Sequence, residues 1–296
     1  MRVQDLFWLI ALAAIWGASF VFMKVASPVL GAAYLAEGRT LFAALFLSCL
    51  AFFLRKNTVL LGHWRHYVQI GFFNSALPFV CLGYAAATLT MSQIAILNST
   101  APLWGFVIGL LLKNERFKLS RGVGLLLGVI GVLVLVGGDK SFANPSTHLP
   151  IIASLISAFP YGVASNLARK QTSIEPFDHA HGSMWAASVL LIPVLFFIPM
   201  KGEPTSITIS ALVAIGVLCS GIAYLIYFRL IKNAGPTSAL AVIFLIPAFT
   251  ALYGMVLFDE PISLSAIVGM GIILLGTLLV TGSIFRSDNL LDSKEC

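Results

Sequence analysis

Ten apolar stretches follow one another along the 296-residue chain, with only short polar connections between them. A helix needs about 20 apolar residues to cross the hydrocarbon core of a bilayer, and inside that core the backbone must satisfy its own hydrogen bonds. We therefore expect an all-α membrane protein with ten transmembrane helices. The first stretch is too long for a signal peptide, so we expect it to be a mature span. The predicted spans are 6–26, 34–54, 67–86, 93–112, 120–136, 149–168, 184–199, 209–228, 238–258 and 263–284.

The scarcity of charged residues excludes most other protein classes. Only 10% of the residues are charged and 59% are hydrophobic, whereas about a quarter of an ordinary soluble domain is charged. Such a chain cannot cover a water-soluble surface, so a soluble enzyme and a disordered chain are both excluded. The net charge of +6 does not indicate nucleic-acid binding, because the basic residues lie in short loops between apolar stretches.

The distribution of Lys and Arg predicts how the chain is oriented. Basic residues gather in the cytoplasmic loops of membrane proteins. If the N-terminus is cytoplasmic, fourteen of the 18 Lys and Arg residues lie on that side, three lie on the other side and one lies within a span. Both termini are then cytoplasmic, which agrees with an even number of spans. We expect a multi-pass protein of a bacterial inner membrane. The three residues on the opposite side are Lys24, Lys140 and Lys201, and the one within a span is Arg39.

An internal repeat divides the chain into two halves. A shift of 145 residues, without gaps, gives eleven identities between residues 102–137 and 247–282, including a Pro, a Glu, a Ser and four Gly. We expect two five-helix repeats, residues 1–145 and 146–285, followed by a cytoplasmic tail, residues 286–296. Five is an odd number, so the repeats must enter the membrane in opposite orientations. Inverted repeats are typical of secondary transporters, although a duplication that serves packing alone remains the alternative.

Several short motifs give the chain a resemblance to a known family. They are Ala14–Phe20, Ala36–Arg39, Ala101–Leu103, Asn114–Arg116, Ile246–Ala248 and Asp259–Pro261, together with the glycine-rich fifth and tenth spans. With these motifs the sequence resembles the drug/metabolite transporter superfamily, and within it the EamA-type ten-helix carriers. The resemblance covers almost the whole chain. It implies export or exchange of amino acids, nucleosides, purine derivatives or other small metabolites.

Ionisable residues inside or near the spans are candidates for function, because burying a charge in a bilayer is costly. Arg39 is expected about one helical turn inside the second span, and Glu37 at its interface. Arg39 would hold a substrate carboxylate or fix an outer gate, and Glu37 would pair with Lys24 or carry a coupling proton. The alternative is an Arg side chain that extends to the interface and an ordinary interfacial Glu.

Polar and aromatic residues within the spans predict a central cavity. Amide side chains in hydrocarbon need partners, which a water-filled or ligand-filled cavity would supply. Hydrogen bonds between helices are the alternative. Aromatic walls with a few polar groups suit small amphiphilic molecules. The predicted substrate-binding residues besides Arg39 are Trp16, Ser19, Asn74, Asn98, Tyr161, Ser165, Ser220 and Tyr224.

Two prolines occupy matching positions in the repeats. Pro102 and Pro247 lie within the fourth and ninth spans. Proline removes a helix hydrogen bond and permits bending. We expect paired kinks at these positions that act as hinges during alternating access, with static kinks as the alternative.

Some chemistries have no signature in the sequence. The histidines lie in loops or at span edges, the cysteines show no metal spacing, and no Gly-rich phosphate loop is present. We expect neither an enzyme nor a metal or cofactor. The sequence predicts a secondary transporter for small metabolites, amino acids first, with protons as a possible coupling ion, acting as a monomer or homodimer. A lipid or lipid-linked-sugar flippase is the alternative.

Overall fold

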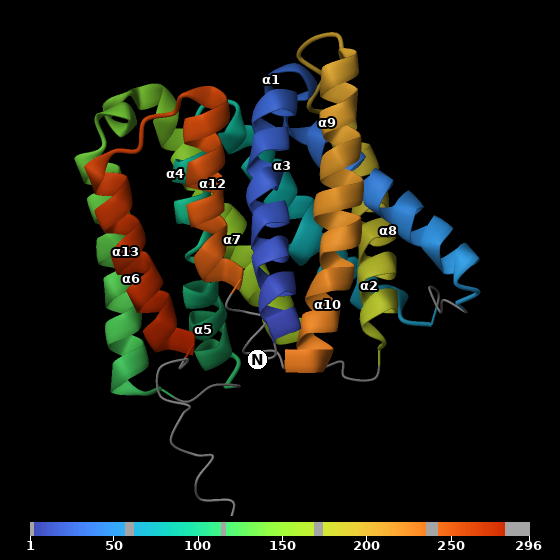
Figure 1. Ribbon diagram of the computed structural model, residues 1–296, viewed down its shortest axis with the longest axis horizontal. Coiled ribbons are helices and arrows are strands. Elements are labelled where there is room, and N and C mark those ends of the chain that lie inside the picture. The colour runs from blue at the N-terminus through green and yellow to red at the C-terminus, as the bar shows by residue number, and fades with distance from the viewer. Residues whose placement is uncertain (1–2, 57–61, 114–116, 169–173, 235–241, 282–296) are drawn as a thin grey trace, which may run out of the picture.

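The described part of the chain consists of helices and short connections and contains no strand, which confirms the all-α fold class. The computed structural model describes residues 3–56, 62–113, 117–168, 174–234 and 242–281 (Figure 1). The predicted tail, residues 286–296, lies outside them. The α-helices are α1 (Val3–Phe53), α2 (Trp64–Ile70), α3 (Leu77–Ala86), α4 (Met91–Asn98), α5 (Ala101–Leu111), α6 (Leu119–Gly138), α7 (His148–Ala168), α8 (Pro176–Leu195), α9 (Ser206–Gly216), α10 (Ala223–Ala234), α12 (Val242–Phe258) and α13 (Leu264–Thr281).

Seven helical stretches in this part of the chain are long and apolar enough to cross a membrane. The longest is α1, which contains the first two predicted spans. It changes direction at Gly31, where φ is 70°. Glycine adopts this backbone conformation without the steric cost that other residues meet. Two helical segments therefore meet at a non-helical residue inside the connection expected between residues 26 and 34. The exact count of ten spans stays a prediction.

Two π-helical turns lie between consecutive α-helices at corresponding places in the two repeats. One is η1 (Gly71–Ala76), between α2 and α3, and the other is η4 (Val217–Ile222), between α9 and α10. The 145-residue shift places Gly71 on Gly216, so the two turns coincide to within one residue. π-turns are rare in proteins, and those that occur often lie at functional sites. The repeat thus extends from sequence to an uncommon local geometry.

The repeat-equivalent helices α6 and α13 lie side by side (Figure 1). A Cβ atom placed on Gly124 would lie 2.6 Å from the carbonyl oxygen of Gly276, and one on Gly131 would lie 2.9 Å from that of Gly269. The backbones approach this closely because glycine has no side chain. The order of these contacts shows that α6 and α13 run antiparallel, as equivalent helices of inverted repeats must.

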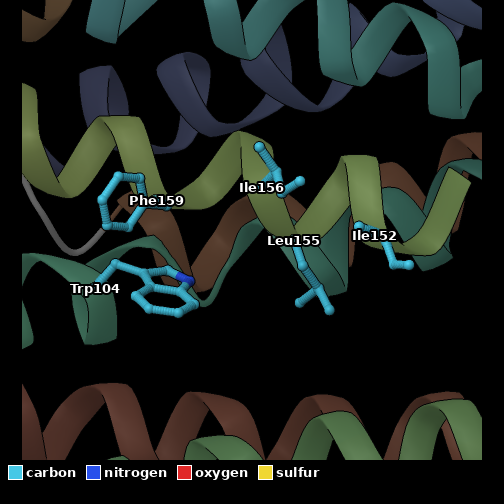
Figure 2. Close-up of a pocket in the computed structure, with 5 residues that line it drawn as sticks. All are labelled: Trp104, Ile152, Leu155, Ile156 and Phe159. Carbon is cyan, nitrogen blue, oxygen red and sulfur yellow. The ribbon is translucent and has the colours of Figure 1, made fainter. Parts of the chain in front are cut away.

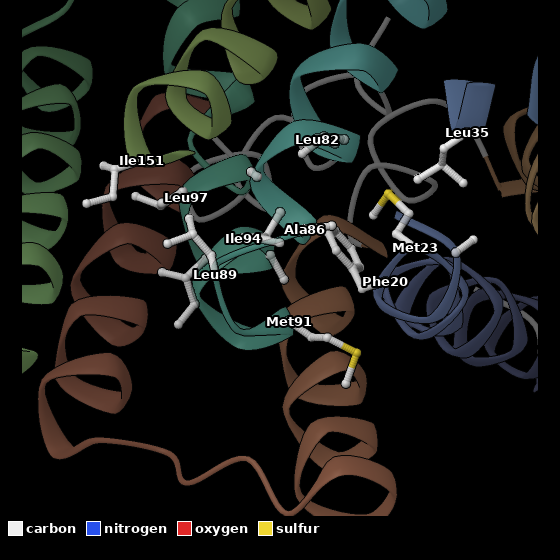
Figure 3. Packing of buried hydrophobic residues seen from close by; sticks show 14 of the residues in the cluster. Phe20, Met23, Leu35, Leu82, Ala86, Leu89, Met91, Ile94, Leu97 and Ile151 are labelled. Carbon is white, nitrogen blue, oxygen red and sulfur yellow. The ribbon is translucent and has the colours of Figure 1, made fainter. Parts of the chain in front are cut away.

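The largest apolar cluster lies where α1 meets α3 and α4. Phe20 and Met23 of α1 pack near Leu82 of α3 and near Ile94 and Leu97 of α4 (Figure 3). Many large apolar side chains also point outward, as expected where the surrounding solvent is hydrocarbon. The short α4 is buried along almost its whole length.

Candidate functional site

Arg39 is the most informative residue of the site because it is charged and only 7% exposed. It lies on α1 beyond the bend at Gly31. Its Nε donates a hydrogen bond to Oγ of Ser220, at 2.9 Å, and its Cζ lies 3.8 Å from the centre of the Phe79 ring. The ion pairs within the described residues are two others, Lys24–Glu260 and Lys56–Glu175. In this part of the chain no carboxylate compensates the Arg39 charge.

The hydroxyl of Ser220 is oriented to receive the Arg39 hydrogen bond. Ser220 Oγ donates its own hydrogen to the carbonyl oxygen of Ile215, five positions earlier, at 3.2 Å. The oxygen lone pairs therefore remain available to the guanidinium. Ser220 belongs to η4, so the wide turn of the second repeat positions the partner of an arginine from the first. The terminal amino groups of Arg39 make no hydrogen bond to any described residue.

An aromatic and amide cluster lies around the same turn. Asn74 Nδ2, from η1, donates a hydrogen bond to the Tyr224 hydroxyl at 2.7 Å. The Trp16 ring meets Tyr224 edge-on, with 6.3 Å between ring centres, and Tyr227 at 5.5 Å. Trp16 Nε1 donates to the Cys219 carbonyl oxygen at 3.2 Å. Both π-turns thus contribute to one cluster that also contains α1 and α10.

The structure gathers most, but not all, of the predicted substrate-binding residues. Trp16, Arg39, Asn74, Ser220 and Tyr224 are linked by the contacts just described, and Tyr161 of α7 lies within electrostatic range of Arg39.

Three other predicted residues have partners outside the Arg39 cluster or within their own helices. The Ser19 and Ser165 hydroxyls each donate to a carbonyl oxygen three residues earlier in their own helices. Asn98 Oδ1 accepts a hydrogen bond from Ser157 Oγ at 3.4 Å, which joins α4 to α7. Within the described residues, none of these three side chains forms a hydrogen bond with Arg39.

Glu37 is buried and has a partner other than Lys24. Its side chain is 8% exposed, so neighbouring helices surround it. Its Oε1 accepts a hydrogen bond from Ser188 Oγ of α8 at 2.6 Å, and no described residue bonds to its Oε2. The pairing with Lys24, one of the two roles expected for Glu37, does not form, because Lys24 has another acidic partner. Helix packing across the bundle, which the sequence does not reveal, decides this result.

That partner is Glu260, which the 145-residue repeat shift places on Glu115. Lys24 Nζ lies 3.4 Å from Glu260 Oε1 and donates to the Leu89 carbonyl oxygen at 3.0 Å. Glu260 Oε2 accepts the Met91 backbone N–H at 2.9 Å. The ion pair joins the two repeats at one end of the bundle. The match between Glu260 and Glu115 in the repeat is the sequence feature that could have indicated a role for Glu260. Glu115 itself lies outside the described residues.

Asp139, which sequence reasoning missed, binds the two repeats near the same end. Its Oδ2 accepts hydrogen bonds from Gln93 Nε2 at 3.0 Å and from Ser263 Oγ at 3.1 Å. Gln93 lies in the first turn of α4 and Ser263 precedes α13. This end of the bundle is therefore closed by one ion pair and one shared carboxylate.

The two predicted hinge prolines lie in different local structures. Pro102 stands at the beginning of α5, just after the turn that ends α4, whereas Pro247 lies inside α12. Proline costs no hydrogen bond in the first turn of a helix. The expected paired kinks are therefore not equivalent, because the fourth predicted span is divided into α4 and α5, whereas the described part of the ninth, residues 242–258, is one helix.

An apolar groove lies between α5 and α7, away from the Arg39 cluster. Trp104 of α5 and Ile152, Leu155, Ile156 and Phe159 of α7 line it (Figure 2). The Trp104 and Phe159 rings meet edge-on, with 5.5 Å between their centres. The groove carries no polar lining, so it suits hydrocarbon.

The described residues contain no group of three or more His, Cys, Asp or Glu side chains that could hold a metal ion. The chemistry that the site offers is therefore recognition by one cation, several hydroxyl and amide groups, and aromatic rings.

Comparison with known proteins places the chain among transporters. The model of the EamA-like transporter family matches residues 5–137 and residues 148–282. An uncharacterized transporter of Archaeoglobus fulgidus is 28% identical, over 90% of this chain and 93% of its own length. The transporter YoaV of Bacillus subtilis is 22% identical, over 96% and 99% respectively. A solved crystal structure aligns over 97% of this chain and 100% of its own, with a TM-score of 0.67 and 16% identity, and shows a similar fold.

Proposed function

Because the chain belongs to the EamA-like transporter family, we propose that it is a secondary transporter that moves small metabolites across a bacterial inner membrane. It works by alternating access, is not an enzyme, and has both termini in the cytoplasm. Amino acids or related carboxylate-bearing compounds are the cargo, and export or exchange is the direction.

The observation that carries this proposal is the buried Arg39 without an acidic partner among the described residues. An uncompensated buried charge is costly, and a guanidinium pairs with a carboxylate through two parallel hydrogen bonds. Ser220 engages Nε, which leaves the terminal amino groups for a ligand. A substrate carboxylate would supply the missing charge.

The surroundings of Arg39 suit a cargo with an apolar portion next to its carboxylate. Phe79 covers the guanidinium on one side, and Trp16 and Tyr224 form an edge-to-face aromatic pair nearby. Asn74 and Tyr161 add polar groups at the same cluster. Binding sites for small amphiphilic molecules combine apolar walls with a few polar groups in this way.

Alternating access requires one end of the bundle to open while the other closes. We propose that Lys24 and Glu260 form the gate at the extracytoplasmic end, because they join the two repeats across the bundle. Pro102 and Pro247 are the hinges of this movement. Glu37 carries a coupling proton, since its Oε2 has no partner among the described residues and is free to accept one.

The proposal is tested by counterflow in proteoliposomes. Vesicles are loaded with a mixture of amino acids, nucleosides and other metabolites, and efflux is followed by mass spectrometry against each external competitor. Saturable exchange of carboxylate-bearing compounds that Arg39→Ala abolishes, while the exposed Arg65→Ala does not, supports the proposal. Exchange that Arg39→Ala leaves unchanged contradicts the carboxylate site.

The groove between α5 and α7 favours a second candidate, a lipid or lipid-linked-sugar flippase. Its wholly apolar lining suits an acyl chain (Figure 2). The same vesicles test it with fluorescent phospholipids and a membrane-impermeant quencher. Lipid translocation without exchange of any soluble compound would replace the carrier by the flippase.

A further inference from the structure

A second pocket lies beside the bend in α1 and takes no part in the proposed transport site. Its lining comes from four segments: α1 just after the bend, α3, α7, and the stretch that follows α8. Its volume is about 440 Å³, within the range of small-molecule pockets, about 300–1,000 Å³. The lining residues are Ala32, Val80, Cys81, Gly83, Tyr84, Ala153, Ile198 and Lys201.

Lys201 is the one charged residue of this lining, and its backbone is fixed in place. The bend at Gly31 frees the Val29 carbonyl oxygen, which accepts hydrogen bonds from the backbone N–H groups of Lys201 and Gly202, both at 3.0 Å. The Lys201 side chain passes Gly31, where a Cβ would lie 3.7 Å from Lys201 Cγ. The break in α1 therefore positions an amine beside an apolar cavity.

The amine of Lys201 has no anionic partner in the part of the chain that the structure describes. The ion pairs found there involve Lys24 and Lys56. A cation next to an apolar pocket complements a ligand with an anionic head and a hydrocarbon body. Within the described residues, the protein supplies neither an anion for the Lys201 amine nor side chains that fill the apolar cavity.

The environment of the pocket indicates where that ligand comes from. Phe196 and Phe197, just before the lining residue Ile198, are each 84% exposed. Large apolar side chains that project this far at the end of a membrane helix lie in lipid. Tyr84, a further lining residue, is partly exposed and carries a hydroxyl at the same end.

We propose that this pocket binds an anionic phospholipid of the surrounding bilayer. The lipid phosphate pairs with the Lys201 amine and accepts a hydrogen bond from the Tyr84 hydroxyl, while one acyl chain fills the space lined by Ala32, Val80 and Cys81. The lipid thereby seals the bend in α1. None of the pocket's lining residues is among those assigned to the cargo site.

Cys81 provides a direct readout of occupancy. The full-length protein is placed in nanodiscs of phosphatidylcholine with or without phosphatidylglycerol and treated with a small neutral thiol reagent. Peptide mass spectrometry then gives the modification rate of Cys81 relative to the exposed Cys49. One lysine contact to a lipid headgroup corresponds to about fivefold in affinity, so we expect phosphatidylglycerol to slow Cys81 modification about fivefold.

Two variants make the test specific. Lys201→Gln should abolish the slowing, and Lys118→Gln, at an exposed lysine elsewhere, should preserve it. Equal rates with and without phosphatidylglycerol in the unaltered protein, or equal slowing in Lys201→Gln, would overturn the proposal. Native mass spectrometry checks it independently: the unaltered protein should retain more phosphatidylglycerol than Lys201→Gln, and equal retention would contradict the site.

Discussion

The Lys24 amine lies 3.4 Å from Oε1 of Glu260 and joins the end of the first predicted span to the residues that follow the ninth. The two side chains are 26% and 9% exposed, so water screens this pair less than it screens a surface pair. The chain also contains the well exposed pair Lys56–Glu175, with 3.2 Å between Nζ and Oε2. The two pairs differ mainly in burial, which makes one a control for the other.

We expect the Lys24–Glu260 pair to contribute a measurable coupling energy. A double-mutant cycle of Lys24→Gln and Glu260→Gln, read from the free energy of unfolding in detergent, should give about 1 kcal/mol. The same cycle for Lys56 and Glu175 should give about 0.3 kcal/mol or less, because exposed pairs contribute little. Equal coupling in both cycles would remove the argument for a gate at Lys24.

Replacing Arg39 should weaken binding of carboxylate substrates specifically. Hydrogen bonds to charged groups contribute about 1.5–3 kcal/mol. Arg39→Ala should therefore raise the substrate concentration at half-maximal transport by about 10- to 100-fold. Arg39→Lys should restore only part of this affinity, because lysine lacks the planar fork. A methyl ester of the transported acid should bind equally to the unaltered protein and to Arg39→Ala. If Arg39→Ala weakens binding of the ester as much as binding of the acid, carboxylate recognition is contradicted.

Ser220 should matter to transport, and its counterpart in the first repeat should not. Ser220→Ala leaves Arg39 Nε without its acceptor, so we expect about a tenfold loss of substrate affinity. The repeat shift places Ser75 on Ser220, and the buried Ser75 Oγ has no partner among the described residues. Ser75→Ala should therefore leave affinity unchanged. Equal losses in the two variants, measured by counterflow, would indicate a packing effect of the π-turns.

Glu37→Gln should separate proton coupling from substrate exchange. Glutamine resembles a protonated glutamate and can still accept the Ser188 hydrogen bond through its amide oxygen. We expect transport driven by a pH gradient to be lost while counterflow at equal pH continues. A variant that keeps its response to the pH gradient would exclude Glu37 as the proton carrier.

Stability should depend on the contact between α6 and α13. Gly124→Ala would place a methyl group 2.6 Å from the Gly276 carbonyl oxygen, and we expect it to destabilise the protein by about 1–3 kcal/mol. Gly271, in the same helix pair, has no atom within 4 Å of such a methyl group. Gly271→Ala should therefore be neutral or stabilising by up to about 1 kcal/mol in the same unfolding assay. A loss of equal size at Gly271 would contradict this explanation.

Hydropathy and repetition predicted the helical fold and the two repeats because both are properties of the local sequence. The site was only partly predictable. Arg39 was recognised as a charge within an apolar stretch, but its bond to Ser220 joins residues 181 positions apart and depends on how helices pack. Glu37 and Lys24 were placed together because both were expected near the extracytoplasmic ends of adjacent spans, and packing gave each another partner.

The turns within predicted spans were the least predictable features. A break near Gly31 was expected, since it lies between the first two predicted spans, but the turn before Pro102 divides a predicted span and only the structure shows it. The π-turns η1 and η4 have no distinct composition, since each adds one residue to a helical turn and leaves the apolar pattern intact.

The reciprocal contacts between α6 and α13 have a consequence for the origin of the chain. Gly124 corresponds to Gly269, and Gly131 to Gly276, so the Gly124–Gly276 and Gly131–Gly269 contacts exchange under the repeat. This is the isologous geometry of a twofold homodimer, in which one surface patch binds its own copy. A single five-helix ancestor could thus have paired with itself before gene fusion, when each glycine served two contacts at once. After fusion the halves were free to diverge, and asymmetries such as Arg39 pairing with Ser220 became attainable.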